Sequence, residues 1–374
     1  MTRSRILIVG GSLGGLFAAT LLHRAGFDVT VYERSTHGLE GRGAGLVAQH
    51  EVFAMLREAG FDHLARIGVT ADERVFLDHE GRIIQRQQTP QMQLSWDMLF
   101  RSFRKLLPHE RYVGGRRITA VTQDAAGATV HFVDGGAERA DLVIGADGIG
   151  SMVRGAVAGP ESHPAYVGYA TWRGLVPEMQ VPKKAAETLF GRFAFYDTQG
   201  SHMLGYLVAG PDGATTEGKR RYNWVWYRRY DAQALGDLLT DIDGRRQEHS
   251  LAPGRVRPEV VADLRANAQT LLPPAFAQAL LAEPRPFLHA IFDYAAPRMV
   301  NGRIALMGDA AFVARPHTAM GVAKAAADAF ALRDALTRHG DMNSALAAYE
   351  VVRAPAGKAV VAYGQRLGQS LNLD

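Results

Sequence analysis

The feature that most restricts the fold of this chain is a glycine-rich turn that joins an apolar strand to an apolar helix near its beginning. Residues 6–9 form a short, purely apolar run, as expected of a strand buried on both faces of a parallel sheet. Residues 10–15 are rich in glycine, and residues 16–22 are typical of a helix that ends near Gly26. Residues 28–33 have the composition of a second strand. The chain therefore opens with a β-α-β unit, which predicts an α/β fold with a Rossmann-like domain.

The turn has the chemistry of a pyrophosphate-binding loop. Gly10 and Gly15 occupy the first and last glycine positions of the G-x-G-x-x-G pattern, while Ser12 replaces the middle one. Backbone N–H groups at such a helix start can approach a pyrophosphate closely. Glu33 ends the second strand, where an acidic side chain accepts hydrogen bonds from a ribose diol. Glycine turns also serve packing alone, but the complete unit predicts dinucleotide binding, with NAD and FAD both open.

Two later blocks repeat the pattern of a buried strand followed by an acid and small residues. Residues 141–151 contain Asp147-Gly148 and are followed by Arg154. Residues 302–311 contain Gly308-Asp309 and lead through Pro316 into a long helix that starts near Gly321. Each block alone is also consistent with a plain strand and turn. An acid at a strand end can hold a ribose or ribityl hydroxyl, and a helix N-terminus stabilises negative charge on a flavin ring.

The spacing of strands and helices predicts two interleaved domains. Strand-like stretches rich in Tyr, Trp, Val and Phe occur at residues 166–175, 203–208 and 222–230. We expect a cofactor domain and an inserted β-sheet domain for the substrate. The cofactor domain is expected at residues 1–74, 95–165 and 287–374, and the sheet domain at residues 75–94 and 166–286. The alanine-rich C-terminal part is helical by propensity, with a break expected at Pro355.

Composition narrows the class of protein further. The chain has 374 residues, of which 47% are hydrophobic and 21% charged, so a folded globular protein is expected. The net charge of +4 comes from interspersed residues, so we expect no nucleic-acid or anionic-membrane partner. No cysteine is present, which excludes disulfides, thiolate metal sites and a cysteinyl flavin. No apolar run is long enough to cross a bilayer, and we expect a cytoplasmic protein without a metal site.

Taken together, the three blocks resemble those of the single-component aromatic hydroxylases, the FAD-dependent monooxygenases typified by para-hydroxybenzoate hydroxylase. Their order and wide separation extend the resemblance over almost the whole chain. Within that family the chain looks most like the dihydroxypyridine hydroxylases. Five short stretches carry this narrower resemblance, at residues 10–12, 32–35, 171–174, 315–317 and 323–325.

The resemblance implies where non-covalent FAD binds in a fold of the glutathione-reductase-like GR2 type. Gly10, Ser12 and Gly15 would lie against the pyrophosphate, and Glu33 would hold the adenosine ribose. Asp309 would contact the ribityl or phosphate region. Backbone N–H groups of residues 321–323 would face the pyrimidine edge of the flavin. The nicotinamide and flavin sites would meet at Asp147 and Gly148. Including these residues, the further expected FAD contacts are Leu13, Gly14, Arg34, Arg42, Gly43, Asp147, Gly148, Gly308, Pro316, Gly321, Val322 and Ala323.

The family chemistry is ring hydroxylation. NADH or NADPH docks transiently and reduces the flavin, and O2 then forms a C4a-hydroperoxide that hydroxylates an electron-rich ring. The substrate would be a small hydroxylated aromatic or pyridine-type compound. The presence of a single dinucleotide fingerprint agrees with transient NAD(P)H binding. A homodimer is a further family expectation.

Candidate substrate contacts come from the helix start and from the inserted sheet. His317, next to Pro316, is the candidate catalytic base because an imidazole titrates near neutral pH. His202, Tyr206 and Tyr227 lie on expected strands and are tentative ring contacts. Packing or helix capping is the alternative for each of them. Arg173 similarly has the alternative of a structural ion pair between domains.

The chain departs from the family pattern at three places, which leaves other functions open. Phe312 stands where many relatives have histidine, and Val322-Ala323 replaces a pattern with asparagine. Trp96 stands where many relatives place a flavin-contacting arginine. The dihydroxypyridine branch shares these departures. Other flavin-dependent oxidations, whether decarboxylative, dehalogenating or on a non-aromatic ring, are the alternative activity. A non-catalytic flavin redox sensor is the alternative from another class.

Overall fold

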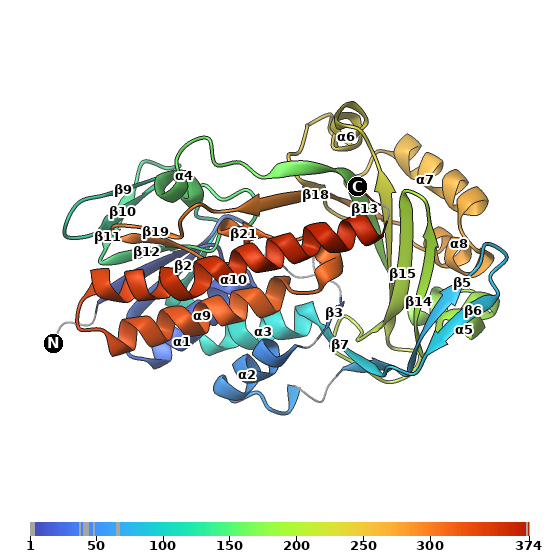
Figure 1. The fold of residues 1–374 in the computed structure, drawn as a ribbon, viewed down its shortest axis with the longest axis horizontal. Helices are drawn as coiled ribbons and strands as arrows, with labels where there is room; N and C mark the ends of the chain where they lie inside the picture. The colour runs from blue at the N-terminus through green and yellow to red at the C-terminus, as the bar shows by residue number, and fades with distance from the viewer. Residues whose placement is uncertain are drawn as a thin grey trace.

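A parallel sheet built around the N-terminal β-α-β unit forms the first half of the molecule (Figure 1). The computed structural model describes residues 4–36, 39, 45–47, 49–64, 68–371 and 373. Five strands of this sheet run parallel and the edge strand β19 is antiparallel. In spatial order the strands are β19 (Val300–Asn301), β20 (Ile304–Leu306), β12 (Leu142–Gly145), β1 (Arg5–Val9), β2 (Asp28–Glu33) and β8 (Tyr112–Gly114).

Helices and a small sheet cover the two faces of the parallel sheet. The helices α1 and α9 pack against each other, and α10 lies alongside α9 (Figure 1). The helices of this half are α1 (Leu13–Arg24), α2 (His50–Glu58), α3 (Trp96–Leu106), α4 (Val153–Ala158), α9 (Gly321–Arg338) and α10 (Met342–Ser370). The antiparallel strands β9 (Ile118–Gln123), β10 (Ala128–Phe132) and β11 (Ala137–Ala140) form the small sheet.

A second, largely antiparallel sheet forms the other half, as the sequence predicted. Its main path runs β17 (Ser250–Leu251), β18 (Phe287–Ala295), β13 (Ala165–Pro177), β16 (Arg221–Arg229), β15 (Ser201–Val208), β14 (Arg192–Thr198), β5 (Glu73–Leu77) and β6 (Ile83–Gln87). The short β21 (Phe312–Val313) pairs with β18. A separate three-stranded sheet contains β3 (Gly45–Val47), β7 (Gln91–Ser95) and β4 (Val69–Ala71).

The two faces of the large sheet have different partners. Trp172, Trp224 and Trp226 are fully buried on one face, in a core that includes apolar residues of the adjacent helices. These helices are α5 (Lys183–Leu189), α6 (Ala232–Leu238), α7 (Pro258–Leu271) and α8 (Pro274–Leu281). Directly paired residues of neighbouring antiparallel strands share a face. Thr171, Tyr227 and His202 are such partners, so they lie on the opposite face, which we call the inner face.

Sheet membership differs from the expected domain limits at two places. β18 pairs with β13, so residues 287–295 lie in the large sheet although we had assigned them to the cofactor domain. β7 pairs with β3 and β4, so residues 91–94 are not part of the large sheet. Such long-range pairing leaves no signal in local residue patterns. The division into two domains stays a prediction.

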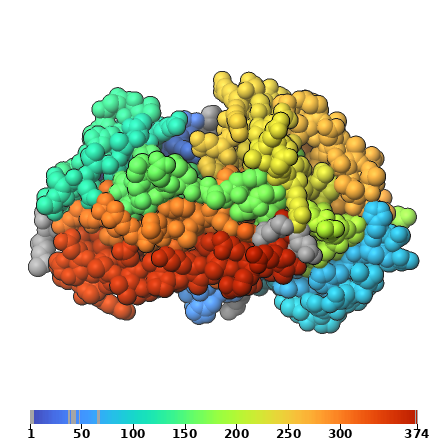
Figure 2. Space-filling model, turned by 45° about the horizontal axis from the view of Figure 1, so that its top comes forward, coloured from blue at the N-terminus to red at the C-terminus, as the bar shows by residue number. Residues whose placement is uncertain are grey.

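The expected helix break at Pro355 is wrong. α10 continues from Met342 to Ser370 with Pro355 inside it. Proline removes one backbone hydrogen bond, normally accepted by the carbonyl four residues earlier, which here belongs to Val351. Val351 is 74% exposed, so water can satisfy this carbonyl. In the space-filling view α10 runs along one side of the molecule and reaches the large sheet with its C-terminal end (Figure 2).

Candidate functional site

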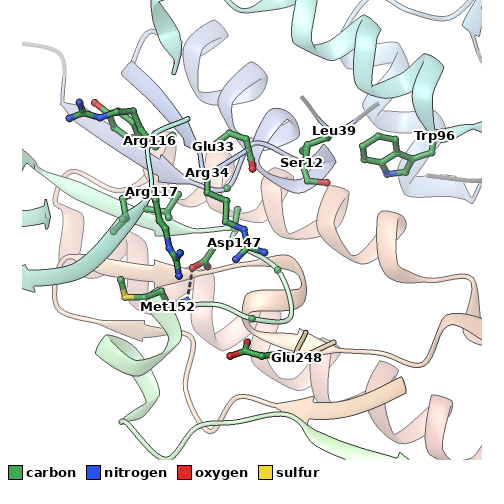
Figure 3. Close-up of a pocket in the computed structure, with 17 residues that line it drawn as sticks. Ser12, Glu33, Arg34, Leu39, Trp96, Arg116, Arg117, Asp147, Met152 and Glu248 are labelled. Carbon is green, nitrogen blue, oxygen red and sulfur yellow. Dashed lines mark hydrogen bonds between the residues drawn. The ribbon is translucent and has the colours of Figure 1, made fainter. Parts of the chain in front are cut away.

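A cavity of about 450 Å³ lies at the carboxyl ends of β1, β2 and β12 (Figure 3). In parallel α/β sheets this edge is where nucleotides bind. Two of the three sequence blocks meet here, because Gly10 and Asp147 both line the cavity. The other lining residues are Val9, Ser12, Tyr32, Glu33, Arg34, Leu39, Trp96, Arg116, Arg117, Ile118, Ala146, Gly148, Gly150, Met152 and Glu248.

The glycine-rich turn is as tight as the motif requires. Gly10 has φ of 109°, a conformation that residues with a side chain rarely adopt. A Cβ atom at Gly10 would lie 2.3 Å from the carbonyl oxygen of Ala146, in the turn that precedes Asp147. A Cβ atom at Gly15 would lie 1.9 Å from the carbonyl oxygen of Gly10. Gly10 and Gly15 therefore allow α1 to start directly above the strand end.

The start of α1 has the properties of an anion site. Ser12 is the N-cap residue, yet its side chain makes no capping hydrogen bond, and Figure 3 shows its hydroxyl at the cavity. The first turn of α1 contains no acidic residue. The backbone N–H groups of the first turn and the Ser12 hydroxyl can therefore serve an external anion, as a pyrophosphate requires. Leu13 and Gly14 belong to this turn.

Glu33 is anchored in the position expected for a ribose-binding acid. It is buried, and its Oε2 accepts a hydrogen bond of 2.8 Å from the backbone N–H of Gly11. Its Oε1 accepts a bond of 2.9 Å from the N–H of Ser35. A carboxylate has further lone pairs, so Glu33 can still accept from a diol. Arg34 lines the same cavity, whereas Arg42 and Gly43 lie outside the described residues.

Asp147 has a structural task at the end of β12. Its carboxylate accepts hydrogen bonds from the Ser151 hydroxyl (2.5 Å) and from the backbone N–H groups of Met152 (2.7 Å) and Val153 (3.2 Å), which begin α4. Burial raises the pKa of Asp147, and these three bonds oppose that rise. The carboxylate therefore fixes the turn that contains Gly148, whose φ is 77°.

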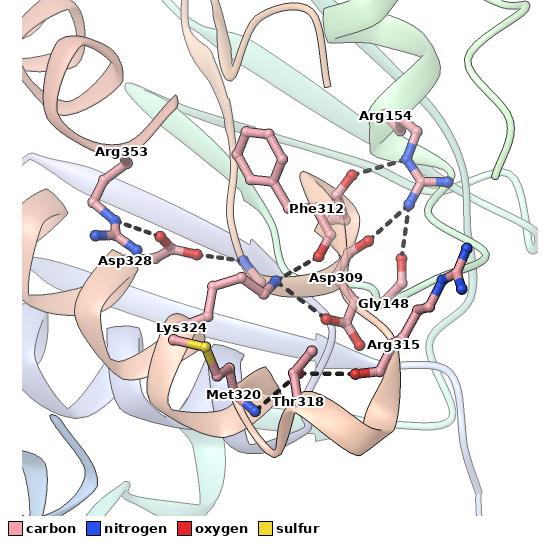
Figure 4. A network of polar contacts seen from close by, with 12 residues as sticks. Gly148, Arg154, Asp309, Phe312, Arg315, Thr318, Met320, Lys324, Asp328 and Arg353 are labelled. Carbon is pink, nitrogen blue, oxygen red and sulfur yellow. Dashed lines mark hydrogen bonds and ion pairs between the residues drawn. The ribbon is translucent and has the colours of Figure 1, made fainter. Parts of the chain in front are cut away.

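Arg154 joins the second and third sequence blocks, a role that sequence reasoning missed (Figure 4). It is buried, and it donates hydrogen bonds to the carbonyls of Ala310 (2.8 Å) and Asp309 (2.8 Å) in one block. It also donates to the carbonyls of Ile149 (2.7 Å) and Gly148 (3.4 Å) in the other. Its guanidinium lies 4.4 Å from the centroid of the Tyr294 ring. Arg154 thus holds the two loops at a fixed separation.

A second polar network supports the Gly308-Asp309 turn. Lys324 has a fully buried side chain whose Nζ lies 3.2 Å from Asp309 Oδ1 and 2.6 Å from the carbonyl oxygen of Phe312 (Figure 4). Asp328 accepts from the N–H of Gly308 (2.9 Å) and pairs with Arg353 (2.6 Å). The carboxylate of Asp309 remains half exposed, so Lys324 orients it without removing it from the surface of the site.

The start of α9 is open. Pro316 and Gly321 are exposed, Val322 is half-buried and Ala323 is buried. The N-cap residue of α9, Met320, provides no side-chain bond to the helix, and the first turn has no acidic residue. Free N–H groups are therefore available where the sequence placed the pyrimidine edge of a flavin.

His317 lies between α10 and the inner face of the large sheet. Its Nε2 is 3.1 Å from the carbonyl oxygen of Gly364 in α10. Since a carbonyl only accepts, Nε2 carries a proton and Nδ1 is the basic nitrogen of the neutral ring. The imidazole lies 6.5 Å from the Tyr169 ring and 5.9 Å from the Tyr227 ring, measured between centroids.

The three tentative substrate contacts of the sheet share its inner face. The ring of His202 is 5.4 Å from that of Tyr227, and its Nδ1 bonds to Asp197. Tyr206 lies farther along β15 and donates a bond of 3.2 Å to the carbonyl of Gly45. Burial raises the pKa of Tyr206 and of Tyr227, so both hydroxyls stay protonated near neutral pH.

Arg173, His289 and Asn223 also lie on the inner face. Arg173 pairs in register with Val225, and His289 pairs with Thr171. Among the described residues Arg173 has no ion-pair partner, so an ion pair with a described carboxylate is not its role. The sequence pattern predicted that Arg173 lies on a strand of this sheet. No local sequence pattern indicated that His289 or Asn223 belongs to the site.

The charge state of His289 gives a pH prediction. Burial, with a smaller contribution from Arg173, lowers the pKa of His289 from 6.5 to about 3. The unfolded chain therefore binds one more proton than the native protein between these pH values. We expect the free energy of unfolding to fall as pH decreases from about 6.5, by at most about 1.4 kcal/mol per pH unit from this residue. Urea unfolding of wild type and His289→Gln at pH 7 and pH 5 measures this fall in the free energy of unfolding. An equally large fall in both proteins would contradict the assignment to His289.

Two negative findings concern the part of the chain that the structure describes. No group of three or more His, Asp or Glu residues there is arranged to hold a metal ion. No helix in this part combines the length and the apolar character needed to cross a membrane.

Family models match three segments of the chain. Residues 8–67 match the NAD(P)-binding Rossmann-like domain. Residues 166–293 match the FAD binding domain-like model, and residues 255–363 match the FAD binding domain. These segments contain two of the three sequence blocks, those around Gly10 and Asp309, and leave out the block around Asp147.

Two curated relatives and one solved structure are similar over nearly the full chain. The 2,6-dihydroxypyridine 3-monooxygenase of Paenarthrobacter nicotinovorans is 33% identical over 360 residues, which cover 96% of this chain and 89% of that protein. The 6-hydroxynicotinate 3-monooxygenase of Pseudomonas fluorescens is 28% identical over 364 residues, with 94% and 87% covered. The structure of 2,6-dihydroxypyridine-3-hydroxylase from Arthrobacter nicotinovorans superimposes with a TM-score of 0.92 at 31% identity, covering 99% of this chain and 93% of that one.

Proposed function

Because the chain belongs to the family of single-component FAD-dependent aromatic hydroxylases typified by para-hydroxybenzoate hydroxylase, we propose that it hydroxylates a small hydroxylated aromatic or pyridine-type ring with NAD(P)H and O2. The observation that carries this proposal is the similarity over nearly the whole chain to an enzyme that acts on a dihydroxypyridine. The site agrees with it, because the nucleotide cavity lies at the start of α1, a helix that packs against α9, and the aromatic sheet face lies beside His317, just before α9.

The residues at the cavity fit FAD. The close approach at Gly10, the Ser12 hydroxyl outside any cap and the anchored Glu33 form a cradle for a pyrophosphate and a ribose. Asp309, oriented by Lys324, would hold the ribityl chain, and the open N–H groups of α9 would face the flavin pyrimidine. When bound, FAD accepts reducing equivalents from NAD(P)H and activates O2.

The inner face of the large sheet would form the substrate chamber. Its apolar and aromatic side chains exclude water from the ring that reacts, and they hold that ring flat beside the start of α9. We propose that His317 takes a proton from a ring hydroxyl through Nδ1, while the bond from Nε2 to Gly364 keeps the imidazole in place. Removal of that proton makes the ring more electron-rich and therefore more reactive toward an electrophilic oxygen.

Replacing His317 tests this role. We expect His317→Gln to retain FAD and to lose about 100-fold in the rate of ring hydroxylation at neutral pH, a typical loss for a general base. The measurement is stopped-flow and steady-state kinetics with product quantified by mass spectrometry. His131→Gln is the control, because His131 lies in β10 and its Nε2 contacts Thr122. Full turnover by His317→Gln would overturn the assignment.

The overall function is tested with the purified yellow protein. NADH and NADPH oxidation are followed with and without hydroxypyridines and phenols, and each product is weighed. A ring that accelerates oxidation and gains one oxygen atom supports the proposal. Oxidation that forms only hydrogen peroxide with every ring points to a different oxidation on the same fold. A flavin that neither nicotinamide reduces favours a redox sensor.

Three further properties are the choice between NADH and NADPH, the oligomeric state and the cellular compartment. We propose that the protein acts in the cytoplasm as a homodimer, which the family resemblance and the absence of cysteine support. The same oxidation assay compares NADH with NADPH. Light scattering after size exclusion measures the mass, and a value near one 40.6 kDa chain would contradict the dimer.

A further inference from the structure

The arginines of the large sheet differ in whether a carboxylate neutralises them. Arg192 pairs with Glu73 at 2.9 Å and Arg221 pairs with Asp97 at 3.4 Å. Arg173 has no carboxylate within 4 Å among the residues that the structure describes, and its buried Nε makes no hydrogen bond there. Its guanidinium lies 5.8 Å from the centroid of the Phe287 ring. Arg173 is therefore a half-buried cation without a counter-charge from described residues.

The position of Arg173 directs this cation into the proposed substrate chamber. It lies on β13 in register with Val225 and Phe287, on the inner face. Two positions along β13 on the same face, Thr171 pairs with Tyr227 of β16 and with His289 of β18, so both residues are diagonal neighbours of Arg173. The Arg173 charge accordingly opposes the rise that burial causes in the pKa of Tyr206 and Tyr227 and adds to the fall in the pKa of His289. These residues come from three further strands or strand positions of the same face. The guanidinium thus shares the inner face with the tentative ring contacts Tyr206 and Tyr227.

The titratable groups around Arg173 do not supply the missing negative charge. Burial keeps the pKa of Tyr206 and Tyr227 above the normal value, so both remain neutral phenols. His289 is neutral near pH 7 because its pKa is about 3. His202 on the same face is paired with Asp197, which is 45% exposed at the sheet rim. A buried charge without a partner is unfavourable, so an anionic ligand would stabilise this arrangement.

Asn223 supplies a second polar group on the same face. It is fully buried, and neither its amide oxygen nor its amide nitrogen has a hydrogen-bond partner among the described residues. It lies opposite Tyr206 on β15 and Leu175 on β13, two positions along β16 from Val225. Buried amides are normally satisfied, so an unpaired one on this face points to a ligand or an ordered water.

We propose that Arg173 binds the negative charge of the substrate, and that the substrate is a planar ring that carries an anionic oxygen, with Asn223 bonding a second polar atom of the ring. This inference rests on the proposed function of the site. The anionic oxygen belongs either to an ionised ring hydroxyl or to a ring carboxylate. A guanidinium suits both, since its planar fork matches oxygen anions and stacks well beside aromatic rings. Arg173 is a positioning residue for the ring.

Two pairs of probes separate charge from shape. 6-Hydroxynicotinate is compared with 6-hydroxynicotinamide, which has the same shape and no carboxylate. 2,6-Dihydroxypyridine, at a pH where it is a monoanion, is compared with 2,6-dimethoxypyridine, which cannot ionise. Dissociation constants are measured from the change in the absorbance of the bound flavin in the holoenzyme, without NAD(P)H. The variants are Arg173→Met, Arg173→Lys and the control Arg228→Met.

Arg228 is a matched control because it also lacks a carboxylate partner among the described residues but lies on the other face. Its guanidinium stacks on Trp226 at 4.7 Å and it borders a groove at the sheet edge. We expect Arg173→Met to weaken binding of the anionic probe about 100-fold and of its neutral partner less than 3-fold, as loss of a charged hydrogen bond predicts. Arg173→Lys should recover about 10-fold, and Arg228→Met should stay within 2-fold.

The outcomes distinguish the sources of the charge. Selective weakening of 6-hydroxynicotinate identifies a carboxylate, and selective weakening of 2,6-dihydroxypyridine identifies a ring oxyanion. If Arg173→Met weakens both members of a pair equally, or if wild type binds none of the four probes, the assignment is overturned. Flavin content and NAD(P)H oxidation without any ring report on the proposed function separately, so its failure is recognised independently.

Discussion

Gly10→Ala is expected to purify without FAD. Gly10 has φ of 109°, and a backbone of this kind carries a strain of about 1–3 kcal/mol for a residue with a Cβ atom. The added methyl group would also lie 2.3 Å from the carbonyl oxygen of Ala146, which is backbone and cannot rotate away. β1 and β12 would have to separate, which would displace the start of α1 from the pyrophosphate. We expect FAD affinity to fall by at least 100-fold, measured by flavin absorbance after size exclusion.

Gly26→Ala is the matched control for this variant. Gly26 also has a positive φ, of 93°, but a Cβ atom there would meet nothing within 4 Å. It therefore carries the strain without the collision, and it lies after the C-terminal end of α1, away from the cavity. We expect it to lose about 1 kcal/mol of stability and to retain FAD. Equal flavin content in both variants would show that close approach at Gly10 is not what the cofactor requires.

Arg154→Met is expected to destabilise the protein by about 3 kcal/mol or more. The substitution keeps an unbranched apolar chain but removes the guanidinium, which leaves the carbonyls of Gly148, Ile149, Asp309 and Ala310 without their donor. Each unsatisfied buried group costs about 1–3 kcal/mol. The loops on both sides of the cofactor region would lose their fixed separation. Urea unfolding at saturating FAD measures the change, and flavin release should accelerate in parallel.

A surface arginine provides the comparison. Arg139 pairs with Asp124 at 2.6 Å, and the two side chains are 48% and 58% exposed. Exposed ion pairs contribute little, so the free energy of unfolding of Arg139→Met should be indistinguishable from that of the wild type. If Arg154→Met were as mild as Arg139→Met, water would be replacing the guanidinium, and the two loops would not depend on it.

The predictions from sequence were most successful where function depends on consecutive residues. The turn around Gly10, the limits of β2 and the strands containing Tyr227 and His202 were predicted closely, because glycine and strand patterns are local. The supporting roles of Lys324 and Arg154 were not predicted, because their hydrogen-bond partners lie elsewhere in the chain and no local sequence pattern indicates such a bond. The roles of the individual site residues stay predictions until variants are measured.

Two of the departures from the predicted structure have the same physical origin. β18 joined the large sheet because Phe287 finds its partner at Arg173, more than one hundred residues away in the chain. α10 passed through Pro355 because the exposed position of Val351 lets water replace the missing bond. Both outcomes depend on tertiary surroundings, which override local propensity.

The alternation of side chains along β13 separates two selective pressures within one strand. Trp172 belongs to the core shared with the outer helices, whereas its neighbour Arg173 lies on the inner face, where we propose that the substrate ring binds. A mutation at an inner-face position can therefore alter which compound is oxidised while the adjacent tryptophan keeps the domain folded. A scaffold of this kind can acquire a new substrate one substitution at a time, because different residues determine the stability of the domain and its substrate specificity.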